Sequence, residues 1–222
     1  MNRQFVSYPK SGRSWIRYIL AQLDLDRRIQ FHHDRFEFND GSRPAHDFEI
    51  ARRLQEYASV EKLVYLQRDP RDVMVSLYFQ VTGRFKDLFN YQRSLSEFIR
   101  DDYFGAHILR QFREMWLEIR SRLGFLTVSY EECHQDMEGT MRRILTYYEL
   151  DVAPDCLSKA VANAEFSKMK ELENSGTFPH PWLKPRNNAA KVRQGKVGGF
   201  RKSLSEDDIS YLNSIFGLPL HC

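Results

Sequence analysis

Three segments of this sequence combine cationic side chains, hydroxyl groups and glycines in a way that suits the binding of phosphate groups. The first segment, residues 8–15, contains Lys10, Gly12, Arg13 and two serines. Unpaired backbone N–H groups at the start of a helix attract anions, and a lysine and an arginine beside them add positive charge. The segment is not a Walker A loop, because its lysine precedes its glycine. The alternative is a plain turn in which Ser14 caps a helix.

The second segment, residues 68–78, follows the short apolar run 63–66 and contains Arg68 and Ser76. Ligands of parallel α/β sheets bind beyond the carboxyl ends of the strands. This turn and the first segment can therefore meet in one crevice if their strands are neighbours, and Arg68 and Ser76 would then hold one phosphate together. The alternative is a solvated run of charges in which Arg68 pairs with Asp69.

The third segment, residues 193–202, carries five cationic or amide side chains and three glycines. Glycine lets the backbone approach a ligand closely, and the arginine fork matches two phosphate oxygens. The segment therefore suits a phosphate as well, and a flexible basic tail is the alternative.

Apolar runs that alternate with helical periodicity predict the elements that position these segments. The alternation indicates an α/β fold with a central parallel β-sheet flanked by helices and right-handed crossovers. Residues 173–201 contain three prolines and predict a long surface loop that contributes to binding and to a lid. The expected strands are 5–8, 63–66 and 125–130, and the expected helical regions are 14–23, 47–57, 70–82, 94–123, 137–150 and 154–165.

Length and composition limit the class of protein. A chain of 222 residues with 42% hydrophobic and 28% charged residues is expected to form a single domain, 1–222, without a membrane span. The net charge of +3 is too small to predict nucleic-acid binding. Three scattered cysteines and no visible secretory signal favour the cytoplasm. The sequence does not indicate the oligomeric state.

The order and spacing of the three segments resemble the motifs of sulfotransferases that use 3′-phosphoadenosine 5′-phosphosulfate (PAPS). The family's Tyr-Pro-Lys-Ser-Gly-Thr-Thr-Trp loop is matched by residues 8–15, with Arg13 and Ser14 in the threonine positions. Its Arg-x-Pro-Arg/Lys-Asp-x-x-Val/Leu-Ser motif is matched by residues 68–76 without a gap. Its late Arg-Lys-Gly-x-x-Gly-Asp-Trp-Lys motif is matched loosely by residues 193–201, where Gln194, Gly199 and Phe200 depart from it. The resemblance implies a P-loop-like nucleotide-binding architecture and transfer of a sulfuryl group from PAPS.

The same resemblance implies the roles of individual residues. Lys10 would stabilise charge on the bridging oxygen and Ser76 would share in catalysis, and no metal is expected because the transferred group carries less charge than a γ-phosphoryl group. The product would be 3′-phosphoadenosine 5′-phosphate (PAP). The residues implied in cofactor binding are Lys10, Ser11, Gly12, Arg13, Ser14, Trp15, Arg68, Ser76, Tyr130, Phe166, Arg193, Gln194 and Gly195.

An acceptor hydroxyl or amine must lose a proton, and histidine is the side chain that titrates near neutral pH. In the soluble branch of the family the base is a histidine about 22 residues before the arginine of the second motif, which here is His46. The rival candidates are His32 and His33, in a Phe-His-His-Asp run. The aromatic segments 31–38, 79–91 and 178–183 suit a small aromatic or otherwise apolar acceptor.

Two other functions are compatible with the basic loops. A P-loop phosphotransferase that uses ATP would need a lysine after the glycines and an acidic ligand for Mg²⁺, which the run 63–66 lacks. A non-catalytic protein that binds anionic polymers would use the loops as a basic surface.

Overall fold

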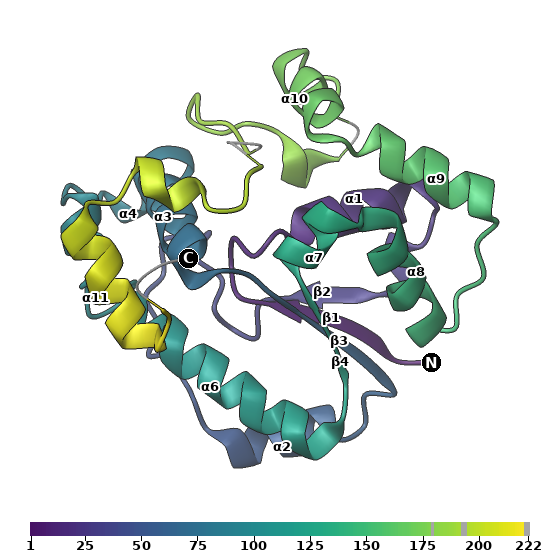
Figure 1. Cartoon of the computed structure of the whole chain (residues 1–222), viewed down its shortest axis with the longest axis horizontal. Helices are drawn as coiled ribbons and strands as arrows, with labels where there is room; N and C mark the ends of the chain where they lie inside the picture. Colours follow the sequence, from purple (N-terminus) through teal and green to yellow (C-terminus); the bar gives the residue numbers. More distant parts are fainter. Residues whose placement is uncertain (179, 192–194, 220–222) are drawn as a thin grey trace.

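A parallel four-stranded β-sheet forms the centre of the fold (Figure 1). The computed structural model of the chain describes residues 1–178, 180–191 and 195–219. Within these residues the strand order is β2-β1-β3-β4. The predicted α/β fold with a central parallel sheet is confirmed. The strands are β1 (Arg3–Ser7), β2 (Gln30–His32), β3 (Lys62–Gln67) and β4 (Leu126–Ser129).

Helices cover both faces of the sheet, which explains why the central strands are apolar on both sides. On one face lie α1 (Arg13–Gln22), α7 (Tyr130–Gln135), α8 (Met137–Tyr147) and α9 (Pro154–Asn163), with α10 (Phe166–Asn174) at their edge (Figure 1). On the other face lie α2 (Ile50–Tyr57), α3 (Pro70–Phe79), α6 (Ala106–Leu123) and α11 (Glu206–Phe216). The shorter elements are η1 (Asp26–Arg28), the π-helical turn η2 (Gln80–Arg84), α4 (Lys86–Phe89), α5 (Leu95–Ile99), η3 (Pro181–Leu183) and η4 (Gly199–Lys202).

Each central strand contributes alternate side chains to two separate hydrophobic cores. Phe5 pairs with Val64 and faces the core beneath α1 and α8. Val6 pairs with Tyr65, and both face the core formed with α3 and α6. Strand side chains alternate between the two faces, which explains why neighbouring residues face different cores. Because β1 and β3 are parallel neighbours, the turns that follow them lie next to each other.

The predicted helical region 94–123 is interrupted in the structure. Asp101 Oδ1 accepts hydrogen bonds from the N–H groups of Tyr103 and Phe104, at 2.9 and 3.0 Å, and forms a turn between α5 and α6. A side chain at Gly105 would come within 2.2 Å of the Asp101 carbonyl oxygen. The strand β2 was not predicted, because three residues at a sheet edge give no clear periodicity. No helix in the described ranges is both long and apolar enough to cross a bilayer.

Candidate functional site

A cavity of about 370 Å³ lies where all four strands end. Each strand leads into a residue of its lining: Lys10 after β1, His33 after β2, Arg68 after β3 and Tyr130 after β4. This is the edge at which parallel α/β sheets bind ligands. The residues of the predicted set that line the cavity are Lys10, Gly12, Arg13, Ser14, Trp15, Arg68, Ser76, Tyr130, Phe166 and Gly195.

The other three predicted residues are not among the described residues of this lining. Ser11 is 2% exposed and lies within the turn, where its N–H donates to the Tyr8 carbonyl at 3.3 Å. Arg193 and Gln194 lie outside the residues that the structure describes. The third segment therefore contributes Gly195, Lys196 and Gly199 to the described wall of the cavity.

The turn after β1 is shaped to expose backbone N–H groups. Lys10 and Gly12 both have positive φ angles, 71° and 103°, and α1 then begins at Arg13 without a side-chain cap. The alternative in which Ser14 caps this helix is therefore wrong. A side chain at position 12 would come within 2.5 Å of the Tyr130 ring, so glycine is required for the close packing of this turn. An uncapped helix start beside Lys10 is suited to an anion.

Arg68 connects the first and third segments. Its Nη1 donates to the Lys10 carbonyl at 3.0 Å, and its Nη2 donates to the Lys196 carbonyl at 3.3 Å. The guanidinium lies over the Tyr130 ring at 4.1 Å. Its side chain is 10% exposed and its Nη2 lies 3.7 Å from Asp72 Oδ2, so the charge stands in a poorly hydrated site where electrostatic attraction is strong.

Asp72 attaches the third segment to the start of α3. Its two carboxylate oxygens accept hydrogen bonds from the N–H groups of Gly198 and Phe200, at 2.8 and 2.9 Å. Asp72 and Arg71 are both buried, so the interpretation of these residues as a solvated run of charges is wrong. The sequence contained no direct signal that Asp72 would hold a segment more than a hundred residues away.

An aromatic cluster forms the wall beside α7. Trp15 lies 5.8 Å from Tyr130, and the His134 ring lies 4.9 Å from Trp15 and 4.6 Å from Tyr130. Trp15 Nε1 is fixed by a hydrogen bond to the Ala164 carbonyl at 2.8 Å. Phe166 is 39% exposed and leaves no room for a side chain on the facing Gly195. Flat apolar surfaces of this kind suit the stacking of a purine base.

Among the candidate bases, His33 is the histidine that lies at the cavity beside Lys10 and Arg13. Its Nδ1 is 2.7 Å from the Ser7 carbonyl oxygen. A carbonyl can only accept a hydrogen bond, so Nδ1 carries the proton and Nε2 presents a lone pair. Burial, together with the charges of Arg13 and Lys191, lowers the pKa of His33 well below 6.5. His33 is therefore neutral at pH 7 and able to accept a proton.

The two other candidate histidines lie elsewhere. His46 does not line the cavity: its Nε2 donates to the Tyr103 carbonyl at 2.8 Å, and its ring stacks on Phe36 and Tyr103. His32 points to the opposite side of β2, where its Nε2 donates to Gln4 at 2.9 Å. Burial, together with the charge of Arg13, lowers the pKa of His32 to about 4.

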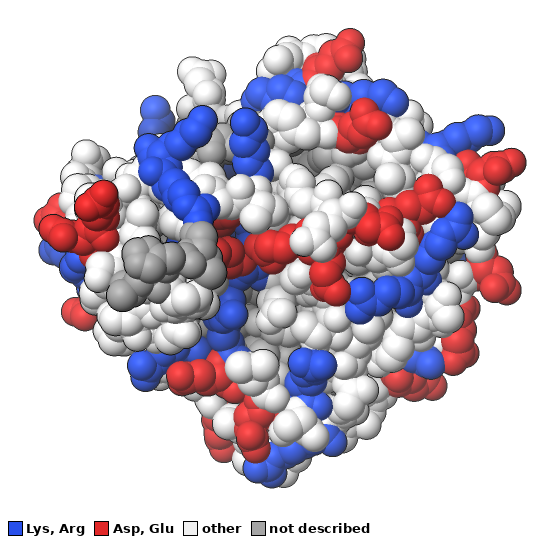
Figure 2. Space-filling model, viewed as in Figure 1, with Lys and Arg blue, Asp and Glu red and all other residues white. Residues whose placement is uncertain are grey.

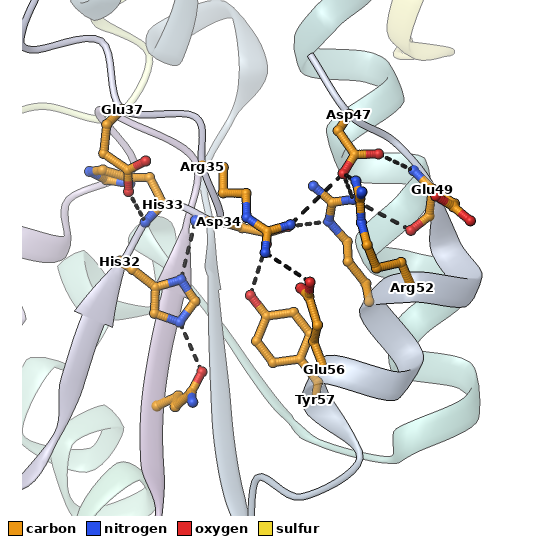
Figure 3. Close-up of polar contacts among 12 residues, drawn as sticks. His32, His33, Asp34, Arg35, Glu37, Asp47, Glu49, Arg52, Glu56 and Tyr57 are labelled. Atoms are coloured by element: carbon orange, nitrogen blue, oxygen red, sulfur yellow. Dashed lines mark hydrogen bonds and ion pairs between the residues drawn. The ribbon is translucent and has the colours of Figure 1, made fainter. Parts of the chain in front are cut away.

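A buried ion pair holds the segment that follows β2 (Figure 3). Asp34 accepts hydrogen bonds from Arg53 Nε at 2.7 Å and from the Tyr57 hydroxyl at 2.8 Å. Glu37 accepts a hydrogen bond from the His33 N–H at 2.9 Å. Together these contacts anchor the backbone of His33 to α2 and to its own loop, so the ring has a fixed position at the cavity.

Replacing Arg53 with alanine is expected to destabilise the protein by about 3–5 kcal/mol, because it leaves the Asp34 carboxylate buried without its cation. Arg53 is 0% exposed. The neighbouring Arg52 is 44% exposed and pairs with Asp47, so Arg52→Ala should cost less than about 1 kcal/mol. Urea unfolding of both variants measures the difference, and equal stability of the two would contradict the structural role of Arg53.

The structure holds no group of three or more His, Cys, Asp or Glu side chains that could bind a metal ion within the part of the chain it describes. On the face drawn in Figure 2, basic and acidic side chains are interspersed rather than separated into one broad basic surface. That distribution does not favour the binding of an anionic polymer on this face.

Comparisons of the sequence with a family profile and with curated proteins identify the same family. The sequence profile described as "Sulfotransferase domain" matches residues 51–221. Sulfotransferase 2B1 of Homo sapiens is 30% identical over 175 residues, which cover 73% of this chain and 47% of the relative. The corresponding protein of Mus musculus is 28% identical over 173 residues, covering 74% and 49%. The chain thus spans about half the length of the curated relatives it matches.

Two solved structures share the fold. Mouse sulfotransferase SULT7A1 complexed with PAP superposes with a TM-score of 0.67 at 16% identity, covering 97% of this chain and 82% of that chain. Retinol dehydratase in complex with androsterone and the inactive cofactor PAP gives a TM-score of 0.64 at 18% identity, covering 97% and 79%. At these identities the likeness is one of fold.

Proposed function

This chain belongs to the sulfotransferase domain family, and from that premise we propose that it transfers the sulfuryl group of PAPS to a hydroxyl or amine of a small acceptor. One observation carries the proposal: a single cavity is lined by the Lys10 turn, by Arg68 and by the Trp15–Tyr130 pair. An anion site, a second cation and an aromatic wall match a nucleotide with charges at both ends of its sugar.

The cavity offers a position for each part of PAPS. The uncapped start of α1, with Lys10 beside it, suits the 5′-phosphosulfate. Arg68 and Ser76 line the same cavity from the second segment and suit the 3′-phosphate. Trp15, Tyr130 and Phe166 supply the aromatic surfaces for adenine. Structures of the same fold contain PAP, which supports the assignment.

The proposed reaction is an in-line displacement at sulfur. The acceptor oxygen or nitrogen forms a bond to sulfur while the bond from sulfur to the 5′-phosphate oxygen breaks, and PAP leaves. We propose that Nε2 of His33 accepts the proton of the acceptor, because Nδ1 already donates to the Ser7 carbonyl. Lys10 neutralises the charge that develops on the leaving phosphate oxygen, so positioning and electrostatics do most of the work.

Apolar side chains of the lining support an acceptor with an apolar body. Among them are Phe38, Phe85, Trp182 and Leu183. Two of these, Trp182 and Leu183, come from residues 173–201, so this segment forms part of the acceptor wall and we propose that it acts as a lid. One structural neighbour was solved with androsterone, a molecule of apolar character, which fits the same idea.

Purified protein is expected to bind PAP on the order of 100-fold more tightly than AMP, because AMP lacks the phosphate that Arg68 and Ser76 would hold. Calorimetry with both nucleotides measures the ratio. Arg68→Gln should bring the affinity for PAP close to that for AMP. Arg110→Gln, on the exposed side of α6 and paired with Glu114, serves as the control and should change neither. Equal affinities of the native protein for PAP and AMP would contradict the proposed function.

A further inference from the structure

Cationic side chains outnumber carboxylates in the described lining of the cavity. Among the described residues that line it, the only carboxylate is that of Asp72, which accepts from the N–H groups of Gly198 and Phe200 and lies 3.7 Å from Arg68 Nη2. PAPS brings about four negative charges, of which the 3′-phosphate supplies up to two. The cationic residues of the described lining are Lys10, Arg13, Arg17, Arg68, Arg84, Lys191 and Lys196.

Three of these cations, Arg13, Arg84 and Lys191, line the cavity together with His33. The charges of Arg13 and Lys191 both act to lower the pKa of His33. Burial, together with the charges of Arg84 and Arg13, lowers the pKa of Lys191 to about 8. Glu173 acts in the opposite direction on Lys191 and on Arg84. Like charges that line one cavity repel one another, and a bound anion would relieve that repulsion.

Two acids, Glu173 and Glu37, attract these cations, but both also bind other groups. Glu173 is 4% exposed, accepts a hydrogen bond from the backbone N–H of Lys191, and pairs with Lys170 Nζ at 2.9 Å. Glu37, whose charge attracts Arg13, accepts a hydrogen bond from the backbone N–H of His33. Each carboxylate thus serves a backbone group as well as a cation.

Arg13 and Arg84 carry buried N–H groups without a hydrogen-bond partner among the described residues, as do Arg17 and Arg68. Arg84 is 7% exposed, and its Nη1 donates to the Lys184 carbonyl at 2.9 Å while its Nε has no partner. Arg13 Nη1 is likewise buried and unpartnered. Buried donors on charged groups are almost always satisfied in proteins. Because Arg13 and Arg84 also line the cavity, their unused donor capacity suits a ligand that can accept hydrogen bonds there.

We propose that the acceptor carries an anionic group, a carboxylate or another oxyanion, which Arg84 and Lys191 bind at the side of the cavity near His33. This inference rests on the proposed function and names its substrate class. Arg13, whose charge reaches both His33 and Lys191, adds to the attraction. Phe38, Phe85 and Trp182 hold the apolar body of the acceptor, so the substrate is an amphipathic hydroxy or amino compound with one negatively charged end.

Matched pairs of acceptors that differ only in charge test the inference. One pair is 6-hydroxy-2-naphthoate and its amide, and a second is 12-hydroxydodecanoate and its amide. Binding is measured by calorimetry in the presence of PAP, and transfer from PAPS is measured as kcat/KM. The carboxylate of at least one pair should be preferred by about tenfold or more, the usual effect of one buried charge contact. Equal or weaker binding of both carboxylates, or no binding of either, would overturn the inference.

Two variants assign the preference to the named residues. Arg84→Gln and Lys191→Gln should each reduce the ratio of carboxylate to amide by about tenfold, while PAP affinity changes less than about twofold. Lys191→Gln decides the matter if Arg84→Gln fails to fold, and Arg110→Gln is the matched control. An equal loss of PAP affinity would show that these cations serve the nucleotide and would overturn the inference. Failure of the native protein to bind PAP would instead contradict the proposed function.

Discussion

Lys10→Met is expected to reduce sulfuryl transfer by about 10²–10³-fold or more, the cost of removing one preorganised charge from a developing oxyanion. Lys10 lies in the turn that follows β1, lines the cavity, and adopts a φ angle of 71°. Methionine keeps the length and the apolar stem of the side chain and removes the charge. Because the charge matters most when the phosphate oxygen leaves, the rate of transfer should fall far more than the affinity for PAP.

The rate is measured as PAP released from PAPS in the presence of an acceptor, together with calorimetry for PAP. Lys168→Met, at an exposed position of α10, removes a lysine of the same kind away from the cavity and should leave both quantities unchanged. A Lys10→Met protein that transfers within tenfold of the native rate would remove Lys10 from the proposed mechanism. A protein that only binds anionic polymers would show no transfer in either form.

His33→Asn is expected to reduce transfer by about 10²–10⁴-fold, the usual contribution of a general base. The asparagine amide can still donate to the Ser7 carbonyl in place of Nδ1, so the loop and the PAP site should be retained while the lone pair of Nε2 is lost. His46→Gln is the matched control, because glutamine can donate to the Tyr103 carbonyl in place of Nε2. It should transfer at nearly the native rate.

The pH dependence of the native protein provides a second measurement of the same residue. The pKa of His33 is lowered, so its neutral, proton-accepting form persists to a lower pH than that of an ordinary histidine. The acidic limb of kcat/KM, which reports the free enzyme, should therefore lie below pH 6.5. The limb should be absent in His33→Asn. If His46→Gln loses activity while His33→Asn transfers at the native rate, His46 and not His33 is the general base.

Most of the fold could be predicted from the sequence because each element carries a local signal. The apolar run 63–66 and the proline at position 70 predict a buried strand and a helix start, and the structure has β3 and α3 at these places. The errors have local causes too. Asp101 binds backbone N–H groups and interrupts the expected helix 94–123, and β2 is a strand because β1 pairs with it rather than by its own composition.

The chain by itself determined the chemistry of the turns after β1 and β3, because the residues that shape a tight turn and start a helix are neighbours in sequence. It also carried the motifs of the sulfotransferase family. Only the tertiary structure separated His33 from His46, because the distance along the chain does not say which loop ends at the cavity. The same holds for Arg84 and Lys191, more than a hundred residues apart, whose like charges meet because the chain folds both segments over the carboxyl edge of one sheet.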